Sequence, residues 1–179
     1  MKSLKTLLTA FALFAVATAT NAQENTTITS SATVVADIVI TPVANVNFGS
    51  IQDTGSPVLD PQGTNTADVG GSATFGKFSI AAANSTQLVI DWNQATVTLN
   101  DGGANNMTYT PDVSANSTDA IATSSDVTKN TAVAATETSA GGALFVYIGG
   151  NLGALSSQAS GTYTSANGSG DLVFTINYQ

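Results

Sequence analysis

The stretch from Thr26 to Thr41 alternates between small or apolar side chains and side chains that are mostly polar or β-branched. The first set is Ile28, Ser30, Ala32, Val34, Ala36, Ile38 and Ile40. Side chains on a β-strand point alternately to opposite faces, so the pattern predicts a strand with one dry face. A strand of this length would extend about 53 Å, whereas ordinary strands have about 5–6 residues. The stretch is therefore either two strands in sequence or one strand that partly serves a surface outside its own domain.

The first 22 residues have the organisation of a secretory signal peptide. Lys2 and Lys5 precede an apolar run from Leu7 to Ala17, and small residues follow at Thr20 to Ala22. The run is too short for a membrane anchor and has no basic flank after it. We therefore expect a secreted protein that passes through the periplasm to the cell surface or the medium. Residues 23–31 would be an N-terminal extension and residues 32–179 a single domain, with no membrane-spanning segment in the mature chain.

The composition excludes several classes of function. Beyond residue 22 the chain keeps two basic residues, Lys77 and Lys129, against twelve acidic ones, and it has no arginine, histidine or cysteine. A nucleic-acid binder needs cations to displace the counterions of phosphates, so no nucleic-acid partner is expected. The absence of cysteine removes disulfides, thiolate metal sites and thiol nucleophiles. The domain must be held by its core, by assembly, or by both.

The remainder of the chain predicts a fold made only of strands. Alternating or apolar runs separated by Gly, Asn, Asp and Ser clusters recur, and no segment after the signal has helical periodicity. The expected strands include 43–51, 72–82, 87–92, 95–100, 107–113, 143–148 and 171–179. Short strands joined by turn signals are typical of an all-β, antiparallel sandwich.

Prolines and glycines give the expected limits of several strands. Pro42 is expected to end the first strand, and Pro111 is expected to mark a strand at a sheet edge. Gly149 and Gly150 are expected to end the apolar strand that precedes them. The Ala/Ser/Thr-rich region 112–142 is expected to be a surface region with a weak strand at 131–136.

No enzyme chemistry is predicted. A Ser-His-Asp triad is excluded because histidine is absent, and the acidic residues show no pairing at strand ends that would hydrolyse glycosides. No cofactor or resident metal is expected. Asp101 and its neighbours Gly102, Gly103 and Asn105 form an oxygen-rich turn that lacks EF-hand spacing, so a plain hairpin is favoured and calcium binding is left open.

Three short motifs give the chain a family resemblance. They are VNFGSI at 46–51, IGGNL at 148–152 with GTY at 161–163, and VFTINY at 173–178. The chain resembles domain of unknown function 4402, a family of secreted bacterial β proteins, over nearly all of its mature length. That family is distantly similar to spore-coat-U-like subunits of chaperone–usher pili.

The resemblance implies an immunoglobulin-like sandwich that receives a strand from a neighbouring subunit, which is β-strand addition. The function it implies is a structural subunit of a fimbria-like filament with a role in adhesion, handled in transit by a periplasmic chaperone and an outer-membrane usher. The implied anchors of the donated strand are Ile28, Ala32, Val34, Ala36 and Ile38. The implied receiving groove or chaperone contact is made by Leu172, Phe174, Ile176 and Tyr178. The chain departs from pilins in lacking a disulfide and in carrying Ala166 where they commonly have glycine.

Two alternatives are left open. In the first, the N-terminal strand pairs within its own domain and the protein is a closed monomer. A monomeric extracellular module that binds carbohydrate or mediates adhesion is the second, and it would use loop aromatics such as Trp92 or Tyr109 with nearby Asn and Asp side chains.

Overall fold

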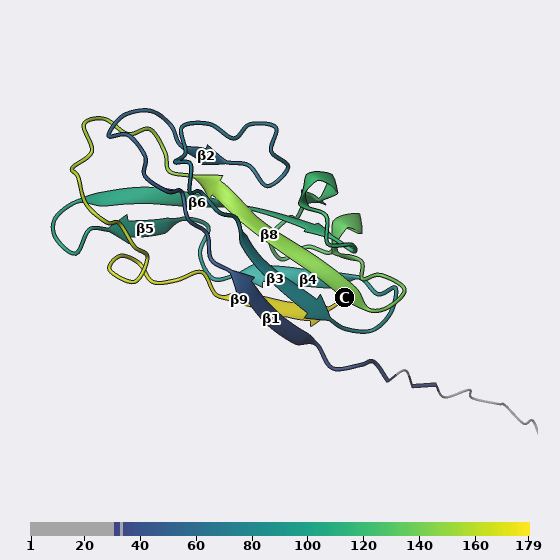
Figure 1. The fold of residues 1–179 in the computed structure, drawn as a ribbon. Coiled ribbons are helices and arrows are strands. Elements are labelled where there is room, and N and C mark those ends of the chain that lie inside the picture. The colour runs from purple at the N-terminus through teal and green to yellow at the C-terminus, as the bar shows by residue number, and fades with distance from the viewer. Residues whose placement is uncertain (1–30, 33) are drawn as a thin grey trace, which may run out of the picture. The chain divides into compact units, whose positions relative to one another are not determined.

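The computed structural model describes residues 31–32 and 34–179, and residues 35–179 form a compact unit. The predicted signal peptide and the donor anchor Ile28 lie outside the described residues. Within the described part, the chain forms β-strands and two single 3₁₀ turns (Figure 1). The strands are β1 (Val39–Ala44), β2 (Val58–Leu59), β3 (Gly76–Ala81), β4 (Leu88–Trp92), β5 (Val97–Asn100), β6 (Asn106–Asn116), β7 (Ser125–Asp126), β8 (Ala143–Asn151) and β9 (Phe174–Tyr178). The turns are η1 (Ile121–Thr123) and η2 (Ala134–Thr136).

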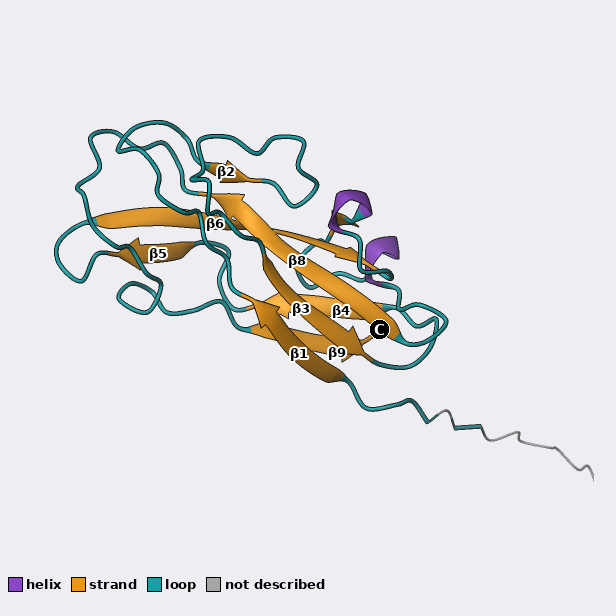
Figure 2. Ribbon diagram, viewed as in Figure 1, coloured by secondary structure: helices purple, strands orange, loops and turns teal. Residues whose placement is uncertain are grey.

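The strands form two antiparallel sheets. The larger sheet has the order β1-β3-β8-β6-β5, with β2 added beside β8 and β7 beside β6. The smaller sheet contains only β4 and β9. In Figure 2 these two strands lie in a separate layer behind β1 and β3. The prediction of an all-β antiparallel sandwich is confirmed, whereas its immunoglobulin-like character and the donated strand stay predictions.

The main core lies between the two sheets. Leu88 and Ile90 of β4 are completely buried, as are Leu144 and Val146 of β8. Side chains two positions apart on a strand share a face, so these residues point between the sheets from both sides. Burial of an aliphatic side chain contributes about 1.5–3 kcal/mol, so this layer holds the small sheet against the large one.

A second apolar cluster fills the other end of the domain. It contains Phe48, Leu59, Val97, Met107, Tyr109 and Leu152. The rings of Phe48 and Tyr109 meet edge to face at 5.7 Å. The Tyr109 hydroxyl donates to the Gly149 carbonyl over 2.6 Å, so its only polar group is satisfied inside the core.

The limits of the first strand differ from the prediction. Strand β1 begins at Val39 and runs through Pro42, which was expected to end it. It pairs only with β3, and its register shifts between Pro42 and Ala44. A proline is tolerated in an edge strand because its missing N–H is not needed by a second neighbour. The expected separate strand at 43–51 does not form, and its first two residues complete β1 instead.

The prediction that Pro111 marks an edge strand was wrong for β6, which lies between β8 and β5. Strand β5 pairs with residues 106–109 of β6, and β7 pairs with residues 114–115. Pro111 itself pairs with Gly150 of β8 on one side. It therefore occupies the gap between β5 and β7, where no partner needs its N–H.

Two further predictions about strands were also wrong. Strand β8 continues through Gly149 and Gly150 to Asn151. A Cβ at Gly149 would lie 1.9 Å from the Leu59 carbonyl oxygen, so the glycine lets β2 approach β8 rather than ending the strand. Residues 131–136 contain the turn η2 instead of a weak strand, because the amide and hydroxyl of Thr136 close the turn with three hydrogen bonds to the Val133 backbone. None of the helices among the described residues has the length and apolar character to span a membrane.

Candidate assembly site at two unpaired strand edges

The main strand orders of the two sheets end in four strands, which are β1, β5, β4 and β9, and the two-residue strands β2 and β7 each add a short edge beside β8 and β6. An uncovered edge presents free N–H and C=O groups that can pair with another chain. The four edges differ in how the rest of the domain covers them.

Residues 164–169 cover the edge of β5. Asn100 and Thr164 exchange two backbone hydrogen bonds of 3.0 Å. Ser169 donates its amide to the Thr98 carbonyl over 3.0 Å, and its hydroxyl accepts from the Thr98 amide over 2.9 Å. This edge is therefore closed by the chain itself.

Residues 130–138 cover the edge of β4 in the same way. The Asn130 amide donates to the Ile90 carbonyl over 2.9 Å. The buried Thr136 hydroxyl donates to the Leu88 carbonyl over 2.6 Å. A threonine hydroxyl thus takes the place of a backbone N–H donor at the point where the turn η2 interrupts the extended segment beside β4.

The outer edge of β9 has no such cover. The Asn93 amide donates to the Val173 carbonyl, and the Gln179 amide donates to the Gln87 carbonyl, so the odd-numbered residues of this region face β4. Backbone groups alternate in direction along an antiparallel pair. Those of Phe174, Ile176 and Tyr178 therefore point away from β4, and within residues 31–32 and 34–179 no strand pairs with them.

Strand β1 also has an unpaired outer edge, and its inner face is poorly covered. Ile40 lies opposite Ile80, which is buried in the core. Directly opposite residues share a face, so Ile40 also points between the sheets. It is nevertheless 41% exposed. The small sheet ends at β9, so it supplies no strand to cover this part of β1.

Exposed apolar side chains belong to the same part of the fold. Among the described residues, the large exposed hydrophobic side chains are Val34, Val35, Val39, Ile40, Val43 and Val173. All of them lie in β1, in the residues that lead into it, or directly before β9. Of these side chains, Ile40 lies on the inner face of β1 and Val39 on its outer face, so only part of this apolar exposure belongs to one candidate interaction surface. We call the outer edge of β9 together with the inner face of β1 the open edge.

The four residues predicted to line a receiving groove all belong to β9 or directly precede it. Ile176 is buried in the main core, and Phe174 packs against Phe78 at 5.0 Å and against Trp92 at 6.0 Å between ring centres. Leu172 is half-buried and packs against both apolar clusters. The side chains thus point into the sandwich, and it is the backbone of β9 that faces the open edge. Sequence reasoning missed Ile40 on the opposite side, although its alternation with Ile38 was visible.

The hydroxyl of Tyr178 joins three parts of the domain at the end of the open edge. It donates to the Ala36 carbonyl over 2.6 Å and accepts from the Ala83 amide over 2.8 Å. Ala36 precedes β1, and Ala83 follows β3. This pair of hydrogen bonds fixes the place where the chain enters the compact unit.

The predicted donor anchors lie in different surroundings. Ala32 is exposed, and Val34 is 96% exposed. Ile38 packs against the core of its own domain. Ala36 is held through its carbonyl by Tyr178. These positions leave the donor role untested, and it stays a prediction.

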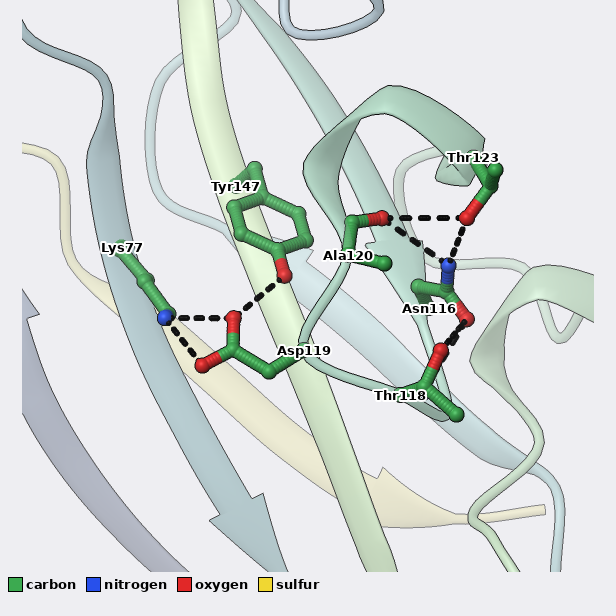
Figure 3. Close-up of polar contacts among 7 residues, drawn as sticks. All are labelled: Lys77, Asn116, Thr118, Asp119, Ala120, Thr123 and Tyr147. Carbon is green, nitrogen blue, oxygen red and sulfur yellow. Dashed lines mark hydrogen bonds and ion pairs between the residues drawn. The ribbon is translucent and has the colours of Figure 1, made fainter.

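A polar cluster on the outer face of the large sheet has a structural explanation. Figure 3 shows Lys77 and Tyr147 converging on the carboxylate of Asp119, with Lys77 Nζ at 2.6 and 2.8 Å and the Tyr147 hydroxyl at 2.9 Å. The lysine and the tyrosine hydroxyl lower the pKa of Asp119, while burial and this carboxylate raise the pKa of Tyr147. Asp119 is 54% exposed. The cluster fastens the loop after β6 to the sheet.

The loop beyond Asp119 is held by a second set of contacts. The side-chain amide of Asn116 donates to the Ala120 carbonyl and to the Thr123 hydroxyl, and its oxygen accepts from Thr118 (Figure 3). These bonds use the polar groups of Asn116 within the loop, so we assign it no chemistry.

In the turn considered for calcium binding, the acidic side chain is already used by hydrogen bonds within the turn. The Asp101 carboxylate accepts from the amides of Gly103 and Asn105 and from the Asn105 side chain at 2.6 Å. These bonds lower the pKa of Asp101. The described residues contain no group of three acidic side chains arranged to hold a metal ion. The hairpin therefore has a structural reason for its composition.

The residues named for a carbohydrate platform are not available at the surface. Trp92 is 7% exposed and Tyr109 is 5% exposed, because both rings belong to the apolar clusters. An open polar hollow of about 410 Å³ lies elsewhere, between the end of β6 and η2, and is lined by serine, threonine and alanine side chains with Asn116 and Glu137. No aromatic ring lines it.

Comparison with known proteins gives no relative from which a function could be carried over. No protein-family model, no curated protein and no solved structure matches the chain.

Proposed function

We propose that this protein is a secreted, non-enzymatic structural subunit that joins copies of itself into a filament by β-strand addition. In this proposal the open edge of one copy receives the N-terminal residues of the next. The observation that carries the proposal is the contrast between the four sheet edges. The edges of β5 and β4 are covered by the chain's own hydrogen bonds, and the outer edges of β9 and β1 are not.

The chemistry of the open edge suits a peptide strand. Phe174, Ile176 and Tyr178 offer an N–H and a C=O each, so an added strand could continue the small sheet beside β9. Such a strand would lie over Ile40 and could bury its exposed surface. Natural domains rarely leave a long apolar edge uncovered unless another chain pairs with it.

The donor in this proposal is the stretch before Val35. Ile38 is already used by the core of its own domain, and Ala36 is tied to Tyr178. The apolar positions left to insert are Ile28, Ala32 and Val34, which share one face of an extended strand. Because two of the three are small or medium in size, the stretch would rely on main-chain hydrogen bonds as much as on side-chain burial.

The exposed edge also suggests which other proteins the subunit would need during export. An exposed apolar edge needs protection until a neighbour arrives, so we propose a chaperone that pairs with β9 in the periplasm and an usher that delivers the subunit to the surface. The basic and apolar organisation of residues 1–22 supports export. The resemblance to domain of unknown function 4402 supports a surface location and a role in adhesion.

The experiment that tests the proposal compares the protein expressed from the full chain with a variant lacking residues 24–31. Size-exclusion chromatography, negative-stain microscopy and unheated SDS gels measure the assembly state. We expect oligomers or filaments that resist SDS from the full chain and only monomers from the deletion variant. Monomers of equal thermal stability from both proteins would refute strand donation.

A further inference from the structure

Strand addition between copies has a competitor within each copy. The N-terminal residues are covalently linked to the same domain that carries the open edge, and a linked segment that can reach its site has an effective concentration in the millimolar range. A second copy at micromolar concentration would lose that competition if the tethered segment could reach β9. This inference rests on the proposed function and concerns what decides between the two outcomes.

We propose that the Tyr178 hydroxyl is a specificity-determining group that favours strand addition between copies over addition of a chain's own N-terminal residues to its own β9. It acts by holding the Ala36 carbonyl at the point where the chain enters the compact unit. The segment before Ala36 would have to break this bond before it could fold back along its own domain.

The directions of the strands define what folding back would require. Val39 lies opposite Ala81 in the pairing of β1 with β3, so Ala36 and Ala83 belong to the same end of the sandwich. Tyr178, the last residue of β9, bonds to both of them. The open edge therefore starts where the chain enters. To pair with its own β9, the segment before Ala36 would have to reverse direction there.

The hydrogen bonds of Tyr178 oppose that reversal. A tight turn at residues 35–37 would rotate the Ala36 peptide, and the bond of 2.6 Å to its carbonyl would be lost. Ile38 adds a second restraint, because it packs against the core immediately after the point of attachment. An incoming segment from another copy requires no change at either position.

The local sequence opposes the reversal independently. Tight hairpin turns need residues that adopt positive φ, usually glycine or asparagine. The residues at the entry point are Val34, Val35, Ala36 and Asp37. Two are β-branched, which disfavours positive φ, and only Asp37 is a turn former.

The experiment uses Tyr178→Phe in the full chain, which keeps the ring in place and removes the hydroxyl. Tyr163→Phe is the matched control, since that hydroxyl also donates to a carbonyl, that of Ala159, and accepts from one N–H group, that of Gln158. Unheated SDS gels and light scattering measure the ratio of monomer to oligomer. We expect Tyr178→Phe to raise this ratio about fivefold to tenfold, the effect of one hydrogen bond, and Tyr163→Phe to leave it unchanged.

Two further variants identify the species that forms. Removing residues 24–31 from Tyr178→Phe should lower the melting temperature of its monomers, because those residues would then fill their own edge. Replacing Ala36 and Asp37 with Asn and Gly, which creates a hairpin turn, should give stable monomers even with Tyr178 intact. Oligomers of Tyr178→Phe at the wild-type ratio, or monomers unaffected by the deletion, would overturn the inference alone. A wild-type protein that stays monomeric would instead refute the proposed function.

Discussion

Two neighbouring residues of β1 allow a sharp test of the open edge. Ile40 points between the sheets and is 41% exposed, whereas Val39 lies opposite Ala81 on the outer face and is 56% exposed. An added strand beside β9 would cover the first and not the second. Both are exposed in the isolated domain, so a change at either one should disturb folding little.

The expected magnitude follows from the exposed fraction of Ile40. Complete burial of an isoleucine side chain contributes about 1.5–3 kcal/mol, so its exposed part corresponds to roughly 0.6–1.2 kcal/mol on docking. Ile40→Ala should therefore weaken association about threefold to eightfold. Ile40→Lys should weaken it much further, because a docked strand would cover an ammonium group that has no partner.

The assay is a titration of each purified variant with a synthetic peptide of residues 23–35, followed by fluorescence anisotropy, with unheated SDS gels for the self-assembled protein. Val39→Lys is the control, and we expect it to bind and assemble as the wild type does. Urea unfolding of the two lysine variants checks that their folded domains are equally stable. Equal peptide affinity for Ile40→Lys and Val39→Lys would refute the assignment of the inner face of β1 to the assembly site.

Three further predictions concern the domain itself. Gly149→Ala should destabilise it by about 1–3 kcal/mol in urea unfolding, because the new Cβ would meet backbone atoms, while Gly71→Ala, with open space at that position, should have little effect. Thr136→Val should cost about 1–3 kcal/mol in the same assay by leaving the Leu88 carbonyl without its donor at the edge of β4; unchanged stability would mean that the hydroxyl does not seal that edge. Burial, with smaller effects of two other carboxylates, raises the pKa of Asp112, so this group contributes stability that is present at low pH and lost as the pH rises through its folded-state pKa. Asp112→Asn should therefore melt higher than the wild type near about pH 7 and at the same temperature near about pH 3, and a constant difference across that range would contradict the assignment.

The strands that sequence reasoning located well are those with strict alternation and clear turns. β4, β5 and β9 fall inside their predicted ranges, and along β4 and β9 the more buried positions alternate with more accessible ones, which gives their sequences a period of two. The residue at which β1 begins could not be predicted from alternation. The alternation continues upstream of Val39, and the strand begins where its partner β3 ends at Ala81.

The hydrogen bonds by which loops cover the sheet edges could not be predicted from the periodicity of the sequence. The β4 edge is closed by a threonine hydroxyl and isolated backbone bonds within a segment rich in Ala, Ser and Thr, and such contacts leave no periodic signal. Pro111 shows the same difficulty. Its missing N–H does indicate an unpaired position, but only the lengths of β5 and β7 reveal that this position lies inside the sheet.

Both lysines of the folded domain are paired with aspartates, and this affects how easily proteases can cleave the protein. Lys77 lies in β3 between two neighbouring strands, with its Nζ on Asp119. Lys129 pairs with Asp91 at 2.5 Å, and the next residue, Asn130, is bonded to β4. Proteases of the trypsin type recognise a basic side chain through an acidic pocket, and the chain contains no other basic residue after residue 5. Cutting at either lysine would first require a strand or its seal to open, so residues 31–179 should withstand trypsin for as long as the sandwich stays folded.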